Sequence, residues 1–347
     1  MLKPLFCFLL LLFSLASLAQ RKYSRDKVSG FFISLVANPT EAPKQFSQVT
    51  FIDKRFDTTK AGFAYDGSKH KILQINGGLV NSLQQYVEKK FTVNDPSLPK
   101  LLIVLRNLWM HELKAGELKE GEDGSEKQNI SRCIAKMEVY VKKDDFYQAL
   151  IRIDTTIEDD AYLKYSGGRL LADLLDQGMK KISALNISDV TSKKTKMTLT
   201  DLMVLYNRRM AVPRLASDTI QRGIYLTFAD FLQRRPMLDN FVLEQDEGGD
   251  YLYLGGNGEQ RLFTDFWGFC DGKSQFIKLG SNFFPLVRDN NSYSFFGCLQ
   301  PIHNSKPRSR NRLARYALFG VFGELHNSRL VNYLRPMQID METGKPF

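Results

Sequence analysis

The segment from Phe266 to Gly297 most constrains the fold, because it alternates apolar segments with short turn sequences. Asp271-Gly272 directly follows Cys270, and this residue pair is preferred in two-residue type I′ hairpin turns. Residues 280–282 (Gly-Ser-Asn) and 289–291 (Asp-Asn-Asn) give two further turn signals. Four short strands joined by three turns predict an antiparallel meander.

The aromatic rings of this segment admit two interpretations, a packed core face or a surface platform for a ligand. Apolar side chains in a strand pattern belong to a core far more often than to a binding site. Each buried ring also removes a large apolar area from water. We therefore predict one packed face, made by Phe266, Phe269, Phe276, Phe284 and Phe295.

The N-terminal half has a different pattern, in which two amphipathic helices are interspersed with strands. The predicted elements are an extended segment at 47–67, a helix at 79–91, strands at 101–110, 133–141 and 146–156, and a helix at 167–185. This strand–helix–three-strand–helix order predicts an α+β domain at 20–187, with a helix on one face of a mainly antiparallel sheet. The polar residues 21–45 are expected to form a leader into this domain.

A charged, Ser/Thr-rich stretch predicts a linker at 188–217, with a short helix that begins at Asp201 and is capped by Thr200. The remaining residues, 218–347, predict a mainly β domain built around the meander. Near its start, Thr227 and the aspartate three residues later have the spacing of a capping box for a short helix. The predicted fold class of the whole chain is α+β.

Residues 1–19 have the three parts of a secretory signal peptide: Lys3, the apolar run Leu5–Leu15 and the small residues Ala16–Ala19. A transmembrane anchor is the alternative, but the apolar run is shorter than the roughly 20 residues that span a bilayer. Cys7 lies inside the apolar run, so we predict no lipidation. No later segment is long and apolar enough to cross a membrane, and we expect the mature protein in the periplasm or at the outer membrane.

The formal net charge is +10, and one segment near the C-terminus is strongly basic. Its basic residues are Lys306, Arg308, Arg310, Arg312 and Arg315. Cations beside an apolar stretch, here residues 316–325, are typical of segments that contact anionic lipid or lipopolysaccharide. The alternative is a solvated loop, which is the commoner outcome for a run of charge.

Motifs for catalysis or for metal binding are scarce. His111-Glu112 is not followed by the second histidine of a zinc protease motif, and no Gly-x-Ser-x-Gly elbow or phosphate-binding loop occurs. Asp53, Arg55 and Asp57 alternate on a predicted strand, so we expect them on one face, either as cross-strand charge pairs or as a site. We predict no metal, no cofactor and no nucleic-acid partner.

Three cysteines remain after the predicted cleavage: Cys133, Cys270 and Cys298. An odd number allows at most one internal disulfide and leaves one free thiol. In an open meander, the strands of Cys270 and Cys298 are the outer two, about 14 Å apart at roughly 4.8 Å per strand step. A disulfide between them requires a closed or strongly curled sheet.

Two groups of motifs resemble exported proteins of unknown function from Gram-negative bacteria. The N-terminal group consists of FIDKRFDTTKAGF, LLIVLRNLWMHEL and KMEVYVKKDDFYQAL. The C-terminal group consists of RGIYLTFADFLQRRPML, FWGFCDGKSQFIKLGSNFFPL and IDMETGKPF, with a YxTFxxFxxxxP pattern before WGxCDGK. The element order of the first domain is also similar to periplasmic lipoproteins that assist outer-membrane transport or assembly. The resemblance implies an envelope location but transfers no activity.

These observations favour a non-enzymatic envelope protein that binds or scaffolds. Its expected partner is an envelope protein, or anionic lipid or lipopolysaccharide contacted through residues 306–315. The alternative is a hydrolase whose site assembles from residues distant in the sequence. A third hypothesis is a protein that binds a peptide or protein partner along an exposed strand edge of the meander.

Overall fold

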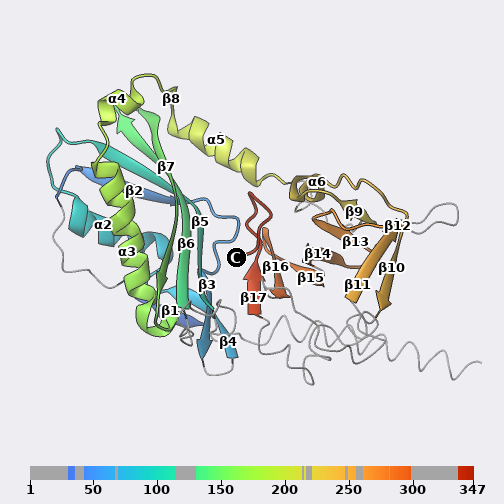
Figure 1. Cartoon of the computed structure of the whole chain (residues 1–347). Coiled ribbons are helices and arrows are strands. Elements are labelled where there is room, and N and C mark those ends of the chain that lie inside the picture. Colours follow the sequence, from blue (N-terminus) through green and yellow to red (C-terminus); the bar gives the residue numbers. More distant parts are fainter. Residues whose placement is uncertain are drawn as a thin grey trace, which may run out of the picture.

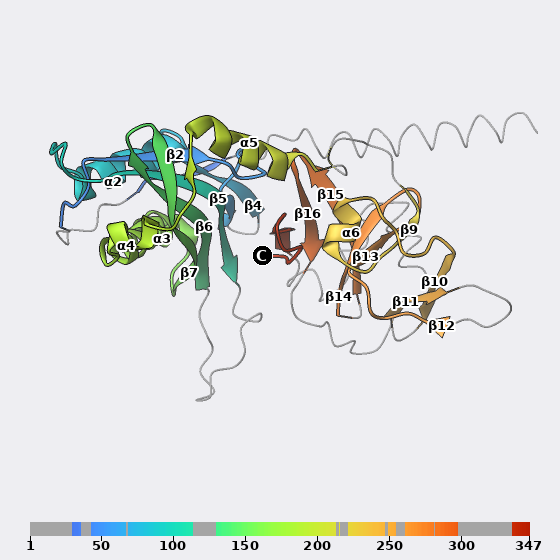
Figure 2. The same ribbon diagram turned by 90° about the horizontal axis from the view of Figure 1, so that it is seen from above.

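The computed structural model describes residues 30–35, 43–66, 69–113, 130–212, 215, 221–246, 249–254, 261–280, 282–297 and 335–347. The predicted signal peptide and the basic run at 306–315 lie outside these residues. The described chain is a mixed α+β protein that is mainly β, and its strands form three sheets (Figures 1 and 2).

The largest sheet, termed the N-terminal sheet, is eight-stranded. Its strands are β1 (Phe31–Ile33), β2 (Gln48–Asp53), β3 (Gly62–Asp66), β4 (Lys69–Ile75), β5 (Lys100–Leu113), β6 (Ile130–Lys143), β7 (Phe146–Asp159) and β8 (Lys196–Met197). They lie in the order β1-β4-β3-β5-β6-β7-β8, and β2 also pairs with β5. The long strands β5, β6 and β7 are antiparallel, whereas β1, β2 and β3 each join a neighbour in parallel.

Two helices, α2 (Leu79–Phe91) and α3 (Leu163–Ser183), lie on one face of the N-terminal sheet (Figure 1). Their apolar stripes, which include Leu83 and Leu171, pack against inward-facing strand residues such as Ile103 and form one mainly aliphatic core. The predicted helices and the three predicted long strands are confirmed. Burial of this stripe rather than helix propensity is what stabilises such helices.

The start of the sheet differs from the sequence prediction in two ways. Phe31–Ile33, predicted to be part of a leader, forms β1 and pairs in parallel with β4. The extended segment at 47–67 is divided into β2 and β3 by a loop. Gly62 begins β3 with φ 147°, and a Cβ atom there would lie 1.8 Å from the carbonyl oxygen of Met110. The close approach of two backbones therefore requires glycine at this position.

The predicted linker contributes to the N-terminal sheet. It forms α4 (Ile187–Thr191), β8, which pairs with β7, and α5 (Leu199–Met210). The predicted cap at Thr200 is wrong: Thr198 is the N-cap of α5, and it forms a reciprocal capping box with Asp201. Leu202 and Tyr206 of α5 pack on the sheet face opposite α3.

The second half of the chain forms a six-stranded sheet, termed the C-terminal sheet, and a small three-stranded sheet. The C-terminal sheet consists of β17 (Arg335–Gln338), β16 (Ser292–Gly297), β15 (Asn282–Asp289), β14 (Gln275–Leu279), β13 (Gly268–Cys270) and β9 (Gly223–Tyr225), in that order. The small sheet consists of β10 (Phe241–Asp246), β11 (Gly249–Leu254) and β12 (Arg261–Leu262). The predicted meander is confirmed as β13–β16, and the predicted capping box is confirmed at α6 (Phe228–Leu232).

The aromatic rings of the meander do not share one face, so that prediction is wrong. Phe266, Phe269 and Phe276 pack with Phe241 and Phe283 in one cluster. The second cluster holds Phe284 and Phe295, which pack together with Phe231, Tyr225 and Tyr293. The C-terminal sheet therefore buries aromatic side chains on both faces, the pattern of a sheet that is covered on each side.

The predicted two-residue turn at Asp271-Gly272 is also wrong. Cys270 pairs with Gln275, which leaves a four-residue loop between β13 and β14. The Asp271 carboxylate accepts hydrogen bonds from the backbone N–H groups of Lys273 and Ser274, at 2.7 and 2.6 Å. This side-chain turn stabilises a longer loop than the dipeptide alone predicts.

Candidate functional site

The C-terminal residues 335–347, termed the C-terminal hairpin, lie at the edge of the C-terminal sheet that faces the N-terminal sheet (Figures 1 and 2). β17 pairs with β16, and the chain then turns back so that Ile339 pairs with Pro346. Met341, Glu342 and Thr343 form the turn. Gly344 has φ 73° and lies against Phe228, where a Cβ atom would approach to 2.3 Å.

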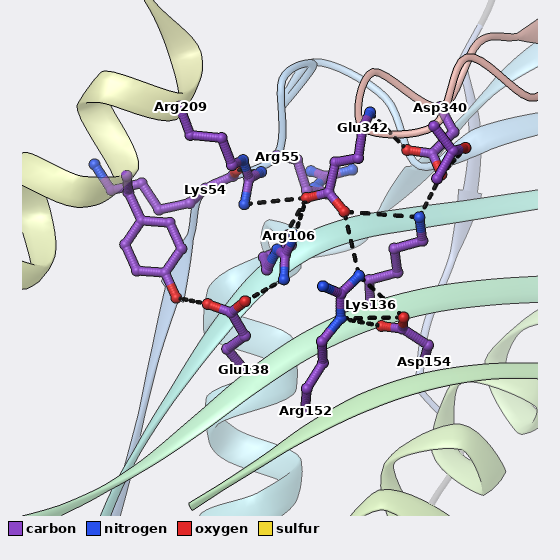
Figure 3. A network of polar contacts seen from close by, with 12 residues as sticks. Lys54, Arg55, Arg106, Lys136, Glu138, Arg152, Asp154, Arg209, Asp340 and Glu342 are labelled. Carbon is purple, nitrogen blue, oxygen red and sulfur yellow. Dashed lines mark hydrogen bonds and ion pairs between the residues drawn. The ribbon is translucent and has the colours of Figure 1, made fainter. Parts of the chain in front are cut away.

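The turn of the hairpin presents two carboxylates to the N-terminal sheet, on the face opposite α3. They belong to a network of polar contacts, termed the charged joint, with side chains from β5, β6, β7 and α5 (Figure 3). The charged joint consists of Arg106, Lys136, Glu138, Arg152, Arg209, Asp340 and Glu342.

Glu342 lies at the centre of the charged joint. Its Oε1 accepts hydrogen bonds from Nε and Nη2 of Arg106, at 2.9 and 2.5 Å, and lies 3.3 Å from Nη1 of Arg209. Its Oε2 lies 3.5 Å from Nη2 of Arg152 and 3.7 Å from Nζ of Lys136. Lys136 also pairs with Asp340. One carboxylate therefore meets four cations, an arrangement in which the pairs are worth more than isolated surface pairs.

Arg106 lies at an irregularity of its strand and points to the hairpin. The β5–β6 register shifts between Leu105 and Asn107, so Arg106 is the extra residue of a bulge. Arg106 continues the alternation of Leu102 and Val104, which face away from α3, and the bulge changes the facing of the residues that follow it. Its guanidinium joins Glu342 of the hairpin to Glu138 of β6, and only 9% of its side chain is exposed.

Two tyrosines close the other end of the network. The hydroxyl groups of Tyr140 and Tyr206 lie 2.9 Å apart, and both form hydrogen bonds with the Glu138 carboxylate. Burial raises the pKa of Tyr206, and the hydrogen bond to Glu138 raises it further. Both phenols therefore stay protonated and act as donors. Burial lowers the pKa of Arg209, and Glu342 partly offsets this effect.

Uncharged contacts extend the same interface. The ring of Phe347 stacks on Trp109 of β5 with centroids 6.1 Å apart, and Trp267 Nε1 donates to the carbonyl oxygen of Gly344 at 2.9 Å. Arg335 Nη1 donates to the Glu112 carbonyl oxygen at 3.0 Å. The C-terminal hairpin thus contacts both sheets through side chains and backbone.

A second polar group lies at the start of α3. Glu112 Oε1 accepts from the backbone N–H of Leu163 at 2.6 Å, and Oε2 accepts from that of Tyr65 at 2.9 Å. The carboxylate therefore satisfies an N–H group of the first helical turn, where the helix dipole favours negative charge. Burial raises its pKa, although these two bonds and Lys164 oppose the shift.

His111, adjacent in sequence, is buried, and neither of its ring nitrogens has a hydrogen-bond partner. Burial lowers its pKa well below the usual value, and the charges of Arg335 and Arg132 lower it further. His111 is therefore a buried residue of β5. A neutral imidazole without a carboxylate partner is not arranged as a general base.

The predicted strand face of Asp53, Arg55 and Asp57 does not form, because β2 ends at Asp53. Arg55 folds back and donates to the Asp53 carboxylate at 2.8 Å. Asp57 lies 3.3 Å from Nζ of Lys60, which also pairs with Asp289 of β15. The three residues are paired locally, and their loop forms a further contact between the sheets.

The other sequence candidates are less informative. The predicted Lys306, Arg308, Arg310, Arg312 and Arg315 lie outside the described residues. Cys298 does too, so the expectation that a disulfide with the buried Cys270 requires a closed or strongly curled sheet is not tested. Within the described ranges, no group of three or more His, Cys, Asp or Glu side chains has the arrangement of a metal site. In the same part of the chain, no helix has the length and apolar content needed to cross a membrane.

Sequence reasoning missed the charged joint. Lys136 and Glu138 occupy the outward positions of β6, between Ala135, Met137 and Val139 of the core, where solvent exposure is the usual expectation. One sequence signal indicated a buried interface on this face. Lys136 and Glu138 have opposite charges on neighbouring outward positions of β6, and Trp109 is a large aromatic at an outward position of β5. No family model matches the chain, and no curated protein matches its sequence.

Proposed function

We propose that the protein is a non-enzymatic binding or scaffolding protein of the bacterial envelope, periplasmic or outer-membrane-associated, in which both sheets act as one body. The charged joint is the observation that carries this proposal. Its cations and carboxylates pair with one another across the two sheets, as in Arg106–Glu342 and Lys136–Asp340. Its four cations face its three carboxylates and that of Asp154, and charges paired in this way serve as a structural connection rather than as a reactive centre.

The state of the nucleophilic and basic groups supports the same proposal. Catalytic nucleophiles are activated by a neighbouring base or by a lowered pKa. Burial instead raises the pKa of the Cys133 thiol, and burial raises the pKa of both tyrosines of the joint. His111 has no hydrogen-bonded partner to orient it.

The proposed contact with an anionic surface involves the segment between β16 and β17. Gly297 and Arg335, which flank this segment, are paired neighbours in the C-terminal sheet. Arg335 also contacts Glu112 at the end of β5, so the flanks are anchored where the two sheets meet. The five basic residues at 306–315 connect to this anchored point, and we propose that they bind anionic lipid or lipopolysaccharide.

Co-sedimentation of the mature protein with vesicles tests this contact. The vesicles contain anionic phospholipid or lipopolysaccharide, and a salt series screens the electrostatic term. Each basic residue near an anionic surface contributes about 1 kcal/mol, so replacing all five residues at 306–315 by alanine is expected to weaken binding by tenfold or more at low salt.

The matched control removes the same charge from exposed lysines elsewhere. Its substitutions are Lys89→Ala, Lys143→Ala, Lys180→Ala, Lys193→Ala and Lys273→Ala. The control is expected to retain most of the binding. Equal loss in both variants, or no binding by the wild type, contradicts the surface contact. Turnover of ester, peptide or glycoside substrates by the purified protein contradicts the non-enzymatic role.

A further inference from the structure

β7 is an edge strand of the N-terminal sheet for most of its length. One edge pairs with β6 from end to end, whereas the other pairs only with β8, at Tyr147 and Gln148. From residue 149 to 159, no strand of the described chain pairs with this outer edge. Such an edge presents a row of backbone donors and acceptors to which another strand can add.

The two faces of β7 differ along this edge. Arg152, Asp154 and Glu158 point to the face opposite α3, and their side chains are 48%, 47% and 45% exposed. Ile153 is buried in the core beneath α3, and Ile157 packs against that core and is half-buried. A strand that adds here therefore has to match charge on one face and apolar side chains on the other.

We propose that the occupant is a second copy of the chain, with β7 pairing antiparallel to β7 about a two-fold axis through Thr155. In this register Arg152 lies opposite Glu158 of the second copy, and Ile153 lies opposite its Ile157. The two-fold axis creates each of these pairs twice. The charged and the apolar residues of β7 are thus complementary to those of an antiparallel β7 from a second copy.

Neighbouring registers are unfavourable. An axis through Asp154 places the two Asp154 carboxylates face to face, and an axis through Thr156 places Asp154 opposite Glu158. Like charges directly opposite each other destabilise a strand pair. An axis between two residues pairs inward-facing with outward-facing side chains, which alternation along the strand forbids.

The ends of the open edge fit the same register. With the axis at Thr155, Ile151 lies opposite Asp159, the last residue of β7. The added strand therefore stops before Gln148, where β8 already occupies the edge. The proposed assembly is one continuous sheet that extends through both copies, with the α3 helices on a common face.

Disulfide trapping tests the register in the full mature protein with Cys298→Ser as background. Opposite residues of an antiparallel pair have Cα atoms about 4.5–5.5 Å apart, within the range that a disulfide bridges. Thr155→Cys is therefore expected to form a covalent dimer on mild oxidation. In the matched control, Thr156→Cys, the two thiols lie on a diagonal of about 7–8 Å, and no dimer is expected.

Charge reversal tests the same pairing without a cross-link. Light scattering after size exclusion is expected to give a dimer mass for the wild type. The single variant Glu158→Arg places two arginines opposite each other and is expected to be monomeric while keeping the wild-type circular dichroism. A monomeric wild type overturns the proposal. It is also overturned if Thr156→Cys forms the covalent dimer as fast as Thr155→Cys does, or if Thr155→Cys, oxidised in cells, is cross-linked only to another envelope protein.

Discussion

The N-terminal and C-terminal sheets form their cores in two different ways. In the N-terminal sheet, the helix α3 (Leu163–Ser183) lies along the long strands, and aliphatic side chains fill the space between them. In the C-terminal half, the only described helix that packs on the sheet is the short α6 (Phe228–Leu232), and aromatic rings fill both faces. A sheet without a long covering helix needs larger side chains to exclude water.

The first prediction concerns Phe269, which is fully buried and stacks or packs edge-on against the rings of Phe241, Phe266, Phe276 and Phe283. Phe269→Ala is expected to lower the free energy of unfolding by about 3–5 kcal/mol, because it leaves a cavity among rings that cannot close it. Denaturant unfolding followed by tryptophan fluorescence measures the change.

The matched control for this substitution is Phe146→Ala, at an exposed aromatic of the N-terminal sheet. It is expected to change stability by no more than about 0.5 kcal/mol. A loss below about 1 kcal/mol in Phe269→Ala would show that the ring cluster is loosely packed and would remove the contrast between the two cores.

The second prediction tests the connection between the sheets. Glu342→Ala leaves Arg106 and Arg209 without their shared carboxylate, and removal of one partner from a largely buried ion pair costs about 3 kcal/mol. A double-mutant cycle with Arg106→Ala is expected to show strong coupling between the two positions. The same denaturant experiment measures both quantities.

Asp154→Asn is the comparison for the charged joint. Asp154 pairs with Arg152 on the same strand, and nearly half of each side chain is exposed. Its loss is expected to cost less than about 1 kcal/mol. If Glu342→Ala and Asp154→Asn destabilise the protein equally, the hairpin carboxylate does not connect the sheets.

The third prediction concerns pH and His111. Its pKa is depressed in the folded protein, whereas the unfolded chain has a value near 6.5. The unfolded state therefore binds the proton first as pH falls, and stability declines below pH 6.5 by about 1.4 kcal/mol per pH unit until the folded-state pKa is reached.

His111→Phe is expected to remove this part of the pH dependence, because neither ring nitrogen has a partner to lose. The difference between the wild-type and variant stability curves, measured from pH 5 to pH 8, isolates the contribution of His111. Parallel curves would mean that His111 can be protonated in the folded state without unfolding, and that its surroundings near Arg335 are wetter than its burial indicates.

Periodicity located the long elements correctly, because burial of a face repeats at 2 or 3.6 residues over many positions. β5, β6, β7 and α3 were all predictable in this way. The sequence did not predict to which face of the sheet an aromatic ring in a short strand points. Phe283 and Phe284 are adjacent and belong to opposite clusters, because different elements cover each face. The strand β1 was also missed, since three residues carry too little pattern.

The set of residues that meet in the charged joint could not be predicted from the sequence, for a different reason. Its residues come from β5, β6, β7, α5 and the C-terminal hairpin, and only the tertiary fold brings them together. The bulge at Arg106 leaves no mark in the local sequence. We hypothesised from the sequence that a partner binds an exposed strand edge of the meander. In the structure β17, at one edge of that sheet, is buried, and the open edge proposed here is that of β7.

The smallest predicted effect is the difference in stability between substituting Thr198, the N-cap of α5, and Thr200, the N-cap expected from the sequence. Thr198 accepts a hydrogen bond from the backbone N–H of Asp201, whose carboxylate accepts from the backbone N–H of Thr198. Thr198→Ala is therefore expected to cost about 1 kcal/mol, while Thr200→Ala, inside the first turn of α5, is expected to change stability by no more than about 0.5 kcal/mol. Thermal unfolding of the two variants side by side measures the difference.

Because α5 carries Tyr206 and Arg209 into the charged joint, a cost of Thr198→Ala that disappears in the Glu342→Ala background would show that the cap stabilises the joint and not the helix alone.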